Sequence, residues 1–489
     1  MQRTHVVIAV LVVVVALAGV GGALVTGSGT PGRYWCAFVS GPTRGDMAEQ
    51  FRSTEALIDA LADVSFDRPP ALVSNAHVTG LGVARALDAH DVPVIALDRP
   101  SDGASGTESG GAGSDGTRRH DGLAPPSDAV DFAGAVTYPL DDLDGFREDV
   151  EAIVDAIGRE AVAFGCMDEW ALAYARANPE GVRLPFAGVD TLDDVLNKSE
   201  LYATCEALGV PYPETYRLAE TADAATGSPE PDATLDEAAE ALGFPLVVKP
   251  ELKRDFEEAF GTNVLEVANR EEFADAVGAA AEEGIAVMAQ KRVDIATGRD
   301  HSLASYVPPS GVEDALAVVG NAAVRFPQQF GTSCLVETAD EPDIEARALA
   351  VLDDAGYHGI SESEFVYDDD RGEFLLLDVN TRPWKWIGMP VAAGANLPMA
   401  AYAAVTDATY ESSGIEPMRW VYLRDYLSLL AGDDAFWDQL SAADWRRLVS
   451  GAFEREGDLT AGVYRPSDPD PAAKLLETEF VDREYYCSC

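Results

Sequence analysis

The sequence predicts an α/β protein with more than one domain, and three observations indicate this fold class. From Pro70 onward, apolar strand-like runs alternate with segments of helical period, as in a doubly wound parallel sheet. Farther along the chain, longer strand-like runs have the pattern of antiparallel pairs. The 489 residues are enough for two or three domains with substantial cores.

The first 46 residues contain an apolar segment that allows two interpretations. Residues 6–25 carry no charge and are long enough to span a bilayer, which predicts a membrane anchor. Alternatively, the true start is Met47, where an ordinary amphipathic sequence begins. The sequence leaves both interpretations open.

Residues 47–190 are expected to form the first domain, with a parallel sheet. Its opening strand, helix and second strand are ALVSNAH, VTGLGVARALDAHD and VPVIALD. His77, Gly80 and Gly82 are predicted to lie in the first strand-to-helix loop, where a tight turn explains a lone Gly-x-Gly better than a dinucleotide site does. Residues 101–126 are rich in Gly, Ser and Asp and are predicted to be a disordered insert.

A later strand of this domain ends in AVAFGCMDEW and places Cys166 and Asp168 at its carboxyl end. In open α/β sheets, ligands bind beyond the carboxyl ends of strands. Loop packing is the alternative interpretation for both residues.

The second domain is predicted to span residues 191–410. Asn197 is expected to cap a helix that contains Lys198, and Gly209 is expected to end it. The buried strand FPLVVKP ends at Lys249, and the run GIAVMAQKRV predicts another strand. Residues 411–489 are rich in Trp and Leu with helical periods and are predicted to be a helical C-terminal appendage.

Charge is the most unusual property of the composition. The 84 acidic and 35 basic residues give a net charge of −49, spread over the whole length. A field of that sign argues against nucleic acid as a partner, and a dispersed acidic surface is typical of adaptation to molar salt. Lysine is so scarce that each one is informative; the chain has Lys198, Lys249, Lys253, Lys291, Lys385 and Lys474.

The six cysteines have no ordered spacing, which favours free thiols in a reducing compartment over a disulfide framework. Cys487 and Cys489 at the C-terminus could bind a soft metal, although two thiolates alone make an incomplete site.

The segment SESEFVYDDDRGEFLLLDVNTRPW carries the strongest functional signal. It predicts two strands around the turn DDDRG. Side chains alternate along a strand, so Glu362 and Glu364 share a face, as do Asp378 and Asn380. Pairing Tyr367 with Glu373 would place Glu362 opposite Asp378 and bring these four side chains together.

Three carboxylates on one face would repel one another unless a hard cation lay among them, and oxygen ligands suit Mg²⁺. Arg382, just beyond the second strand, could hold a phosphate. The alternative is a solvated hairpin, which explains poorly why Asp378 and Asn380 interrupt an apolar strand.

Taken in order, NKSELYATCEALGVPYPET, VVKP, AQKRV and HGISESEFVYDDDRGEFLLLDVNTRPW resemble the ATP-grasp superfamily, most of all its carboxylate–amine ligases of the D-aspartate-ligase-like group. The resemblance spans roughly residues 71–406. It implies a Rossmann-like pre-ATP-grasp domain followed by the two subdomains of the grasp. A protein with this charge pattern and resemblance is expected to come from a halophile-type proteome.

The resemblance also implies roles for individual residues. Lys198 and Lys249 would contact the phosphates of ATP, and the strand AQKRV would hold adenine through its backbone. Glu364, Asp378 and Asn380 would bind Mg²⁺ (or Mn²⁺), with Arg382 as the phosphate partner. The adenine-binding strand comprises Gln290, Lys291, Arg292 and Val293.

Three features depart from the family pattern, and one is Thr381, which follows Asn380 where a Pro is frequent. Asp378 stands where a Glu is common, which shortens the ligand arm by one methylene. No glycine-rich phosphate loop is recognisable in ELKRDFEEAFGTN, where Lys253, Arg254 or residues 261–263 could substitute.

Substrate recognition is expected in RFPQQFGTSCLVET. Arg325 could pair with a carboxylate and Ser333 could assist, although a surface arginine beside a strand is the alternative. Arg299 and His301 are weaker candidates, and His358 is expected to be structural.

The implied reaction joins a carboxylate to an amine through an acyl phosphate and releases ADP and phosphate. Arg382, Lys249 and Arg325 are the candidate catalytic residues. Two alternatives stay open: a biotin-carboxylase-like ligase that uses bicarbonate, although no biotin-carrier lysine motif is present, and a nucleotide-binding module without catalysis. ATP chemistry predicts a cytoplasmic protein, either free or anchored at the inner face of the membrane by residues 6–25.

Overall fold

The computed structural model describes residues 49–50, 53–100, 122–224, 230–262, 264–293, 298–328, 331–432, 436–455 and 457–479. Within these ranges, no helix is both long enough and apolar enough to cross a membrane. The predicted anchor at residues 6–25 and the terminal Cys487 and Cys489 lie outside the described residues. The three described cysteines, Cys166, Cys205 and Cys334, are buried free thiols, as predicted.

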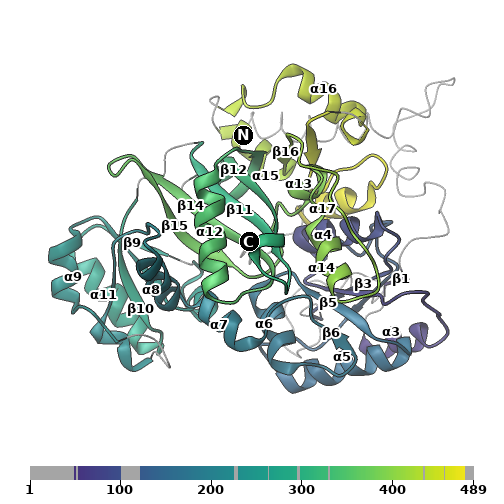
Figure 1. The fold of residues 1–489 in the computed structure, drawn as a ribbon, viewed down its shortest axis with the longest axis horizontal. Helices are drawn as coiled ribbons and strands as arrows, with labels where there is room; N and C mark the ends of the chain where they lie inside the picture. Colours follow the sequence, from purple (N-terminus) through teal and green to yellow (C-terminus); the bar gives the residue numbers. More distant parts are fainter. Residues whose placement is uncertain are drawn as a thin grey trace.

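The first part of the chain forms a six-stranded parallel sheet, which confirms the predicted doubly wound pattern. The order of its strands is β1-β4-β3-β2-β5-β6. They are β1 (Glu49–Gln50), β2 (Ala71–Ser74), β3 (Val94–Asp98), β4 (Phe132–Ala135), β5 (Ala161–Gly165) and β6 (Val182–Arg183). Figure 1 shows α3 (Thr54–Leu61), α5 (Leu143–Ile157) and α6 (Asp168–Ala177) along one side of this sheet and α4 (Val78–Asp88) on the other.

Helix α4 is buried almost completely, because it is packed between the first sheet and helices α13 (Gly388–Ala392) and α14 (Leu397–Ala404). The prediction that Gly80 and Gly82 lie in a loop is wrong, since both lie inside α4. A Cβ atom at Gly82 would come within 2.6 Å of the Ile387 side chain, so close helix packing explains this glycine.

The predicted disordered insert is too long at its C-terminal end. Residues 101–121 lie outside the described part of the chain, but Leu123 and Ala124 are fully buried in the core of the first sheet. The segment 122–126 is therefore part of the fold, because its apolar residues find a packing partner that the composition does not reveal.

A small antiparallel sheet follows, with the strand order β7-β10-β8-β9. Its strands are β7 (Thr215–Arg217), β8 (Leu246–Pro250), β9 (Leu265–Val267) and β10 (Val287–Lys291), and its helices are α9 (Leu235–Leu242), α10 (Lys253–Phe260) and α11 (Arg270–Glu282), with the short η2 (Ala219–Ala224). It stands at the left of Figure 1 and has its own apolar core beneath α9 and α11.

A large sheet of seven strands forms the middle of the molecule, in the order β15-β14-β11-β12-β13-β16-β17. Its strands are β11 (Asp300–Val307), β12 (Leu316–Phe326), β13 (Thr332–Thr338), β14 (Gly359–Asp368), β15 (Glu373–Asn380), β16 (Arg419–Val421) and β17 (Leu459–Ala461). One face packs against α7 (Val189–Leu196), α8 (Lys198–Leu208) and α12 (Pro342–Asp354) around a common apolar core, and η3 (Val312–Asp314) precedes β12.

The C-terminal region contains the predicted helices, here α15 (Leu423–Gly432), α16 (Ala442–Ser450), η5 (Ala452–Glu454) and α17 (Asp470–Glu479). It is more than an appendage, because β16 and β17 extend the large sheet beyond β13. Asp468 also accepts a hydrogen bond from the buried Arg85 of α4 at 2.9 Å. The region thus joins the first sheet to the third. The predicted domain boundaries at 47, 190 and 410 stay predictions.

Candidate active site

The acidic hairpin is formed by β14 and β15, but its register differs from the prediction. Tyr367 pairs with Phe374 near the turn, and farther along Glu364 lies opposite Asp378 and Glu362 opposite Asn380. The prediction of Tyr367 opposite Glu373 and of Glu362 opposite Asp378 is therefore wrong.

An irregularity beyond Phe365 explains why the four polar side chains still share a face. Phe365 pairs with Leu376, and the next pair is Glu364 with Asp378, so Leu377 is an extra residue in β15. Opposite residues of an antiparallel pair point to the same face, and a shift of one residue reverses the face. Without this bulge, Glu364 would lie opposite Leu377, and Asp378 and Asn380 would point away from the glutamates.

The four side chains are held by one another and by nearby donors. The Asn380 amide donates to Glu364 at 2.9 Å and to Glu362 at 3.2 Å. Burial raises the pKa of Glu362, and the neighbouring Glu364 raises it further. Two carboxylates that accept from the same amide would repel one another if both were ionised, so the pair favours a proton or a cation nearby.

Lys198 neutralises Asp378. Its ammonium lies 2.9 Å from both carboxylate oxygens, and it is the first residue of α8, whose N-terminus is capped by the Asn197 side chain. Burial alone would raise the pKa of Asp378, but the charge of Lys198 and then that of Lys253 hold it below its ordinary value.

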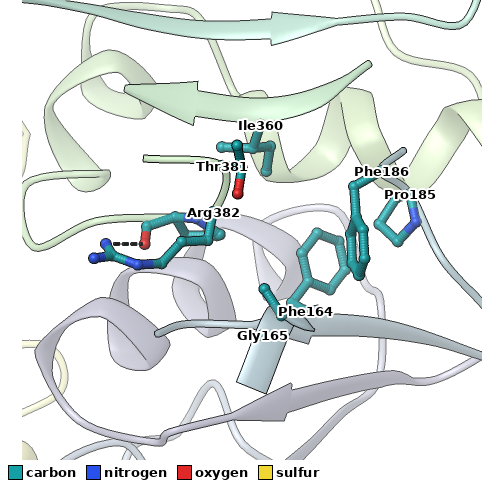
Figure 2. Close-up of a pocket in the computed structure, with 9 residues that line it drawn as sticks. Phe164, Gly165, Pro185, Phe186, Ile360, Thr381 and Arg382 are labelled. Atoms are coloured by element: carbon teal, nitrogen blue, oxygen red, sulfur yellow. Dashed lines mark hydrogen bonds between the residues drawn. The ribbon is translucent and has the colours of Figure 1, made fainter. Parts of the chain in front are cut away.

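Arg382 follows β15, and its Nε and Nη2 donate to Asp168 and Asn380, while Nη1 has one contact, with the Pro383 carbonyl. Its guanidinium donates to Asp168 at 2.7 Å, and Asp168 is the first residue of α6 at the carboxyl end of β5. Figure 2 shows Thr381 directed toward Phe164 and Gly165 across the seam between the large sheet and the first sheet, with the Arg382 guanidinium turned away from them. The space there, about 10 Å³, has room for a single water at most. The seam is therefore an interface that orients Arg382.

Arg325 lies on β12 and pairs with two protein carboxylates. It forms a close two-pronged ion pair with Asp300, with its Nη2 2.9 Å from Oδ1, and the same nitrogen is 3.5 Å from Glu364. Its Nη1 donates to the Gly331 carbonyl at 2.9 Å. Arg325 is therefore not a surface arginine, because its charge is fixed beside the acidic hairpin.

The small sheet provides the opposite wall. Lys249 at the end of β8 is partly buried, and burial, followed by repulsion from Lys198, lowers its pKa to about 8. The Gln290 side chain points inward and donates to the hydroxyls of Tyr202 at 3.0 Å and Thr215 at 2.9 Å. The Gln290 side chain is therefore held by protein groups, and the backbone of β10 pairs with β7 on one side and β8 on the other.

All of the predicted site residues line one cleft between the small and large sheets, with a cavity of about 170 Å³. They are Lys198, Lys249, Gln290, Lys291, Arg292, Val293, Arg325, Glu364, Asp378, Asn380 and Arg382. Ser333 also lines it, whereas His301, which lies opposite Phe365 in the register, points to the other face of the large sheet. Arg299 lies over the Tyr367 ring, and His358 contributes its carbonyl to Ala187.

The lysines give the cleft its electrostatic character. Five of the six lysines in the chain, all except Lys474, line this cavity. In a protein with a net charge of −49, such a concentration makes the cleft a local site for anions. Lys253, expected as a possible substitute for the phosphate loop, lines the cleft, and the scarcity of lysine would also have identified Lys385, which was not among the predicted site residues.

The residues of the hairpin fit a hard cation by the chemistry of their donors. Glu364 and Asp378 offer carboxylate oxygens and Asn380 an amide oxygen, and Arg325 lies 3.5 Å from Glu364. Within the described residues, no group of three His, Cys, Asp or Glu side chains is already gathered around one point. Asp378 would therefore have to turn partly from Lys198 to join such a site.

The arrangement of these sheets is that of an α/β ATP-grasp fold, which confirms the predicted fold class. A biotin carboxylase from Campylobacter jejuni in complex with an ATP analogue matches 73% of this chain and 74% of its own, with a TM-score of 0.52 at 15% identity. The biotin carboxylase domain of 2-oxoglutarate carboxylase from Hydrogenobacter thermophilus, with ADP, Mg²⁺ and bicarbonate, matches 72% and 73%, with a TM-score of 0.51 at 13% identity.

An N5-carboxyaminoimidazole synthetase from Staphylococcus aureus in complex with ADP matches 73% of this chain and 82% of its own, with a TM-score of 0.50 at 13% identity. The sequence matches no protein-family model and no curated protein. The similarity thus defines the fold, and the chemistry has to be argued from the cleft.

Proposed function

We propose that the protein is an ATP-dependent ligase that joins a carboxylate to an amine. The observation that carries this proposal is the gathering of five lysines and a face of carboxylates in one cleft of an ATP-grasp fold. Cations on one wall suit a polyphosphate, and oxygen ligands on the other suit the divalent ion that accompanies it.

The residues of the chain would divide the work as follows. Lys249 and Lys198 would bind the phosphates of ATP, and the backbone of residues 290–293 would hold the adenine. Mg²⁺ held by Glu364, Asp378 and Asn380 would neutralise charge on the transferring phosphoryl group. Arg382, oriented by Asp168, would hold that group in line.

The reaction has two steps. A carboxylate oxygen of the acid attacks the γ-phosphorus, and the bond from this phosphorus to the bridging oxygen of ADP breaks, with the electron pair leaving on ADP. The amine nitrogen then attacks the acyl carbon, inorganic phosphate leaves, and a proton passes from nitrogen to solvent. The product is an amide.

Bicarbonate is the second candidate for the acid. The neighbour from Hydrogenobacter thermophilus holds bicarbonate together with ADP, and its fold is similar. In that case, the intermediate would be carboxyphosphate.

ADP release by the full-length protein tests the proposal. The protein is incubated in molar KCl with Mg²⁺ and ATP, with pools of amino acids and small carboxylic acids, with bicarbonate alone, or without an acid. ADP that forms only with an acid and an amine supports the ligase. Release with bicarbonate alone favours the second candidate. Tight ATP binding without ADP in any pool would replace the ligase with a nucleotide-binding module.

A further inference from the structure

One end of the cleft contains a buried group of residues to which the predicted function gives no role. Lys385 lines the cavity and is only 6% exposed. Its ammonium donates to Asp425 at 2.6 Å and to the Thr332 hydroxyl at 2.7 Å, and it lies 4.5 Å from the centre of the Tyr422 ring. A charged side chain buried in this way is normally paired, and this one also lines a cavity.

The C-terminal region supplies the partner of Lys385. Asp425 lies in the first turn of α15 and is 3% exposed. One of its oxygens accepts from Lys385 and the other accepts from Arg424 at 2.9 Å. Lys385 and Arg424 thus share this carboxylate.

A second cation is fixed beside the first. Arg325 donates to the carbonyl of Gly331, and Lys385 donates to the side chain of the next residue, Thr332. The start of β13 therefore anchors both cations at the same end of the cleft. Arg325 also reaches Glu364 of the acidic hairpin, so this end adjoins the proposed metal ligands.

The donors of Lys385 leave one position for a ligand. An ammonium has three N–H groups, and the described contacts of Lys385 use two of them, toward Asp425 and Thr332. The remaining N–H suits an anionic oxygen. The lysines of the small-sheet wall suit phosphate, so the anion at this end is a different part of the reaction.

We propose that Lys385 binds a carboxylate group of the acid substrate, and that Asp425 and Thr332 are positioning residues that hold its ammonium toward the cleft. The C-terminal region thereby completes the substrate site. This inference rests on the proposed ligase function, since it names the end of the cleft that receives the acid.

Lysine-selective NMR tests the inference without relying on turnover. With only six lysines, the full-length protein labelled with ¹³C at the lysine ε-carbon gives a simple spectrum, and the K385R variant assigns the Lys385 signal. Acetate, succinate and each standard amino acid are added in turn, with ADP and Mg²⁺ present. The Lys385 signal is expected to move in a saturable way with at least one carboxylate, while that of Lys474 on α17 stays unchanged.

Addition of ATP alone separates the two proposals. Movement of the Lys249 and Lys198 signals with ATP supports nucleotide binding whether or not any acid moves Lys385. If no carboxylate moves the Lys385 signal, or if an acid that supports ADP release leaves it in place, the inference is overturned while the ligase proposal survives.

Substitutions then test the positioning roles through the acid identified by ADP release. Removing a charge-assisted hydrogen bond in K385M is expected to raise the KM for the acid by about ten- to a hundredfold, with the KM for ATP little changed. D425N and T332V are expected to raise the same constant by a smaller factor. In T332S, which keeps the hydroxyl, the KM for the acid should stay close to the wild-type value.

A matched control and a second measurement keep this test decisive. Ser428 lies on α15 with an exposed side chain, so S428A should leave both constants unchanged. Because D425N leaves Arg424 and Lys385 with a weaker partner and could fail to fold, T332V carries the test in that case. Equal loss of acid and ATP binding in T332V would reduce Lys385 and its partners to a structural role.

Discussion

The two walls of the cleft bear similar charges but compensate them differently. On the large-sheet side, Arg325, Arg382 and Lys385 each pair with a carboxylate, which fixes the position of each side chain. On the small sheet, Lys249 has neither a hydrogen bond nor an ion pair among the described residues, and its pKa is lowered. The difference indicates that the large-sheet wall is preorganised, whereas Lys249 has no such partner among the described residues.

This comparison has an energetic consequence. A paired buried cation contributes little net stability but is expensive to disrupt, because its partner is left alone. An unpaired cation weakens the fold and strengthens the binding of an anion by a similar amount. The two walls should therefore respond to substitution in opposite directions.

The largest expected effect comes from Asp378, whose carboxylate on β15 pairs with Lys198 at the start of α8. D378N keeps the size of the side chain but removes its charge, so ADP release should fall by about a thousandfold while the circular dichroism spectrum stays unchanged. D370N in the exposed turn of the same hairpin is the control and should retain full activity. Undiminished turnover in D378N would exclude Asp378 as a metal ligand.

The second prediction contrasts two lysines in urea unfolding and ATP titration. K198M removes the ion-pair partner of the half-buried Asp378, so the free energy of unfolding should fall by about 1–3 kcal/mol. K249M removes an unpaired cation, so the free energy of unfolding should rise by about 1–3 kcal/mol while ATP affinity falls at least about tenfold.

K474M, outside the cleft, is the control for both variants. If K249M proved less stable than the wild type, the contrast between the walls would be refuted.

The third prediction is a pH dependence of the free energy of unfolding that comes from Lys249. The folded-state pKa is about 8 and the unfolded value is 10.5, so between these values the unfolded chain binds more protons. The free energy of unfolding therefore gains a contribution that grows as the pH rises from about 8 to 10.5. The stability advantage of K249M over the wild type should shrink across this range.

Through the same lysine, ATP affinity should change with pH in the direction opposite to the free energy of unfolding. The phosphates favour the charged ammonium, so above about pH 8 binding must be accompanied by proton uptake, and affinity should fall as the pH rises. Calorimetry in buffers of different ionisation enthalpy measures this uptake. A wild-type protein with the same proton uptake as K249M would show that Lys249 does not contact the phosphates.

The smallest effect on binding is expected at Gln290. Its side chain holds Tyr202 and Thr215, so Q290L should lower the free energy of unfolding by about 1–2 kcal/mol. ATP affinity should change little, because the strand is expected to bind adenine through its backbone. The exposed Gln439 provides the control Q439L, which should alter neither quantity. A large loss of ATP affinity in Q290L alone would assign the side chain a direct contact.

Much of the fold could be predicted from the sequence because its signals are local. Alternating strands and helices predicted the first sheet, Asn197 and Gly209 marked the ends of α8, and the hairpin was visible from its turn. Many residues of the cleft could also be predicted, since lysine is scarce and the acidic residues of β14 and β15 recur at alternate positions.

Only the tertiary structure decided the register of β15 and the ion-pair partners of the charged side chains. The bulge at Leu377 shifts β15 by one residue, and no local pattern fixes such a shift because it depends on the strands and helices packed around it. Asp168 and Arg382 are 214 residues apart in sequence, and Lys385 finds Asp425 in a region predicted to be an appendage. The sequence determined which chemical groups are present, whereas long-range packing determined which of them neutralise one another and which are left for a ligand.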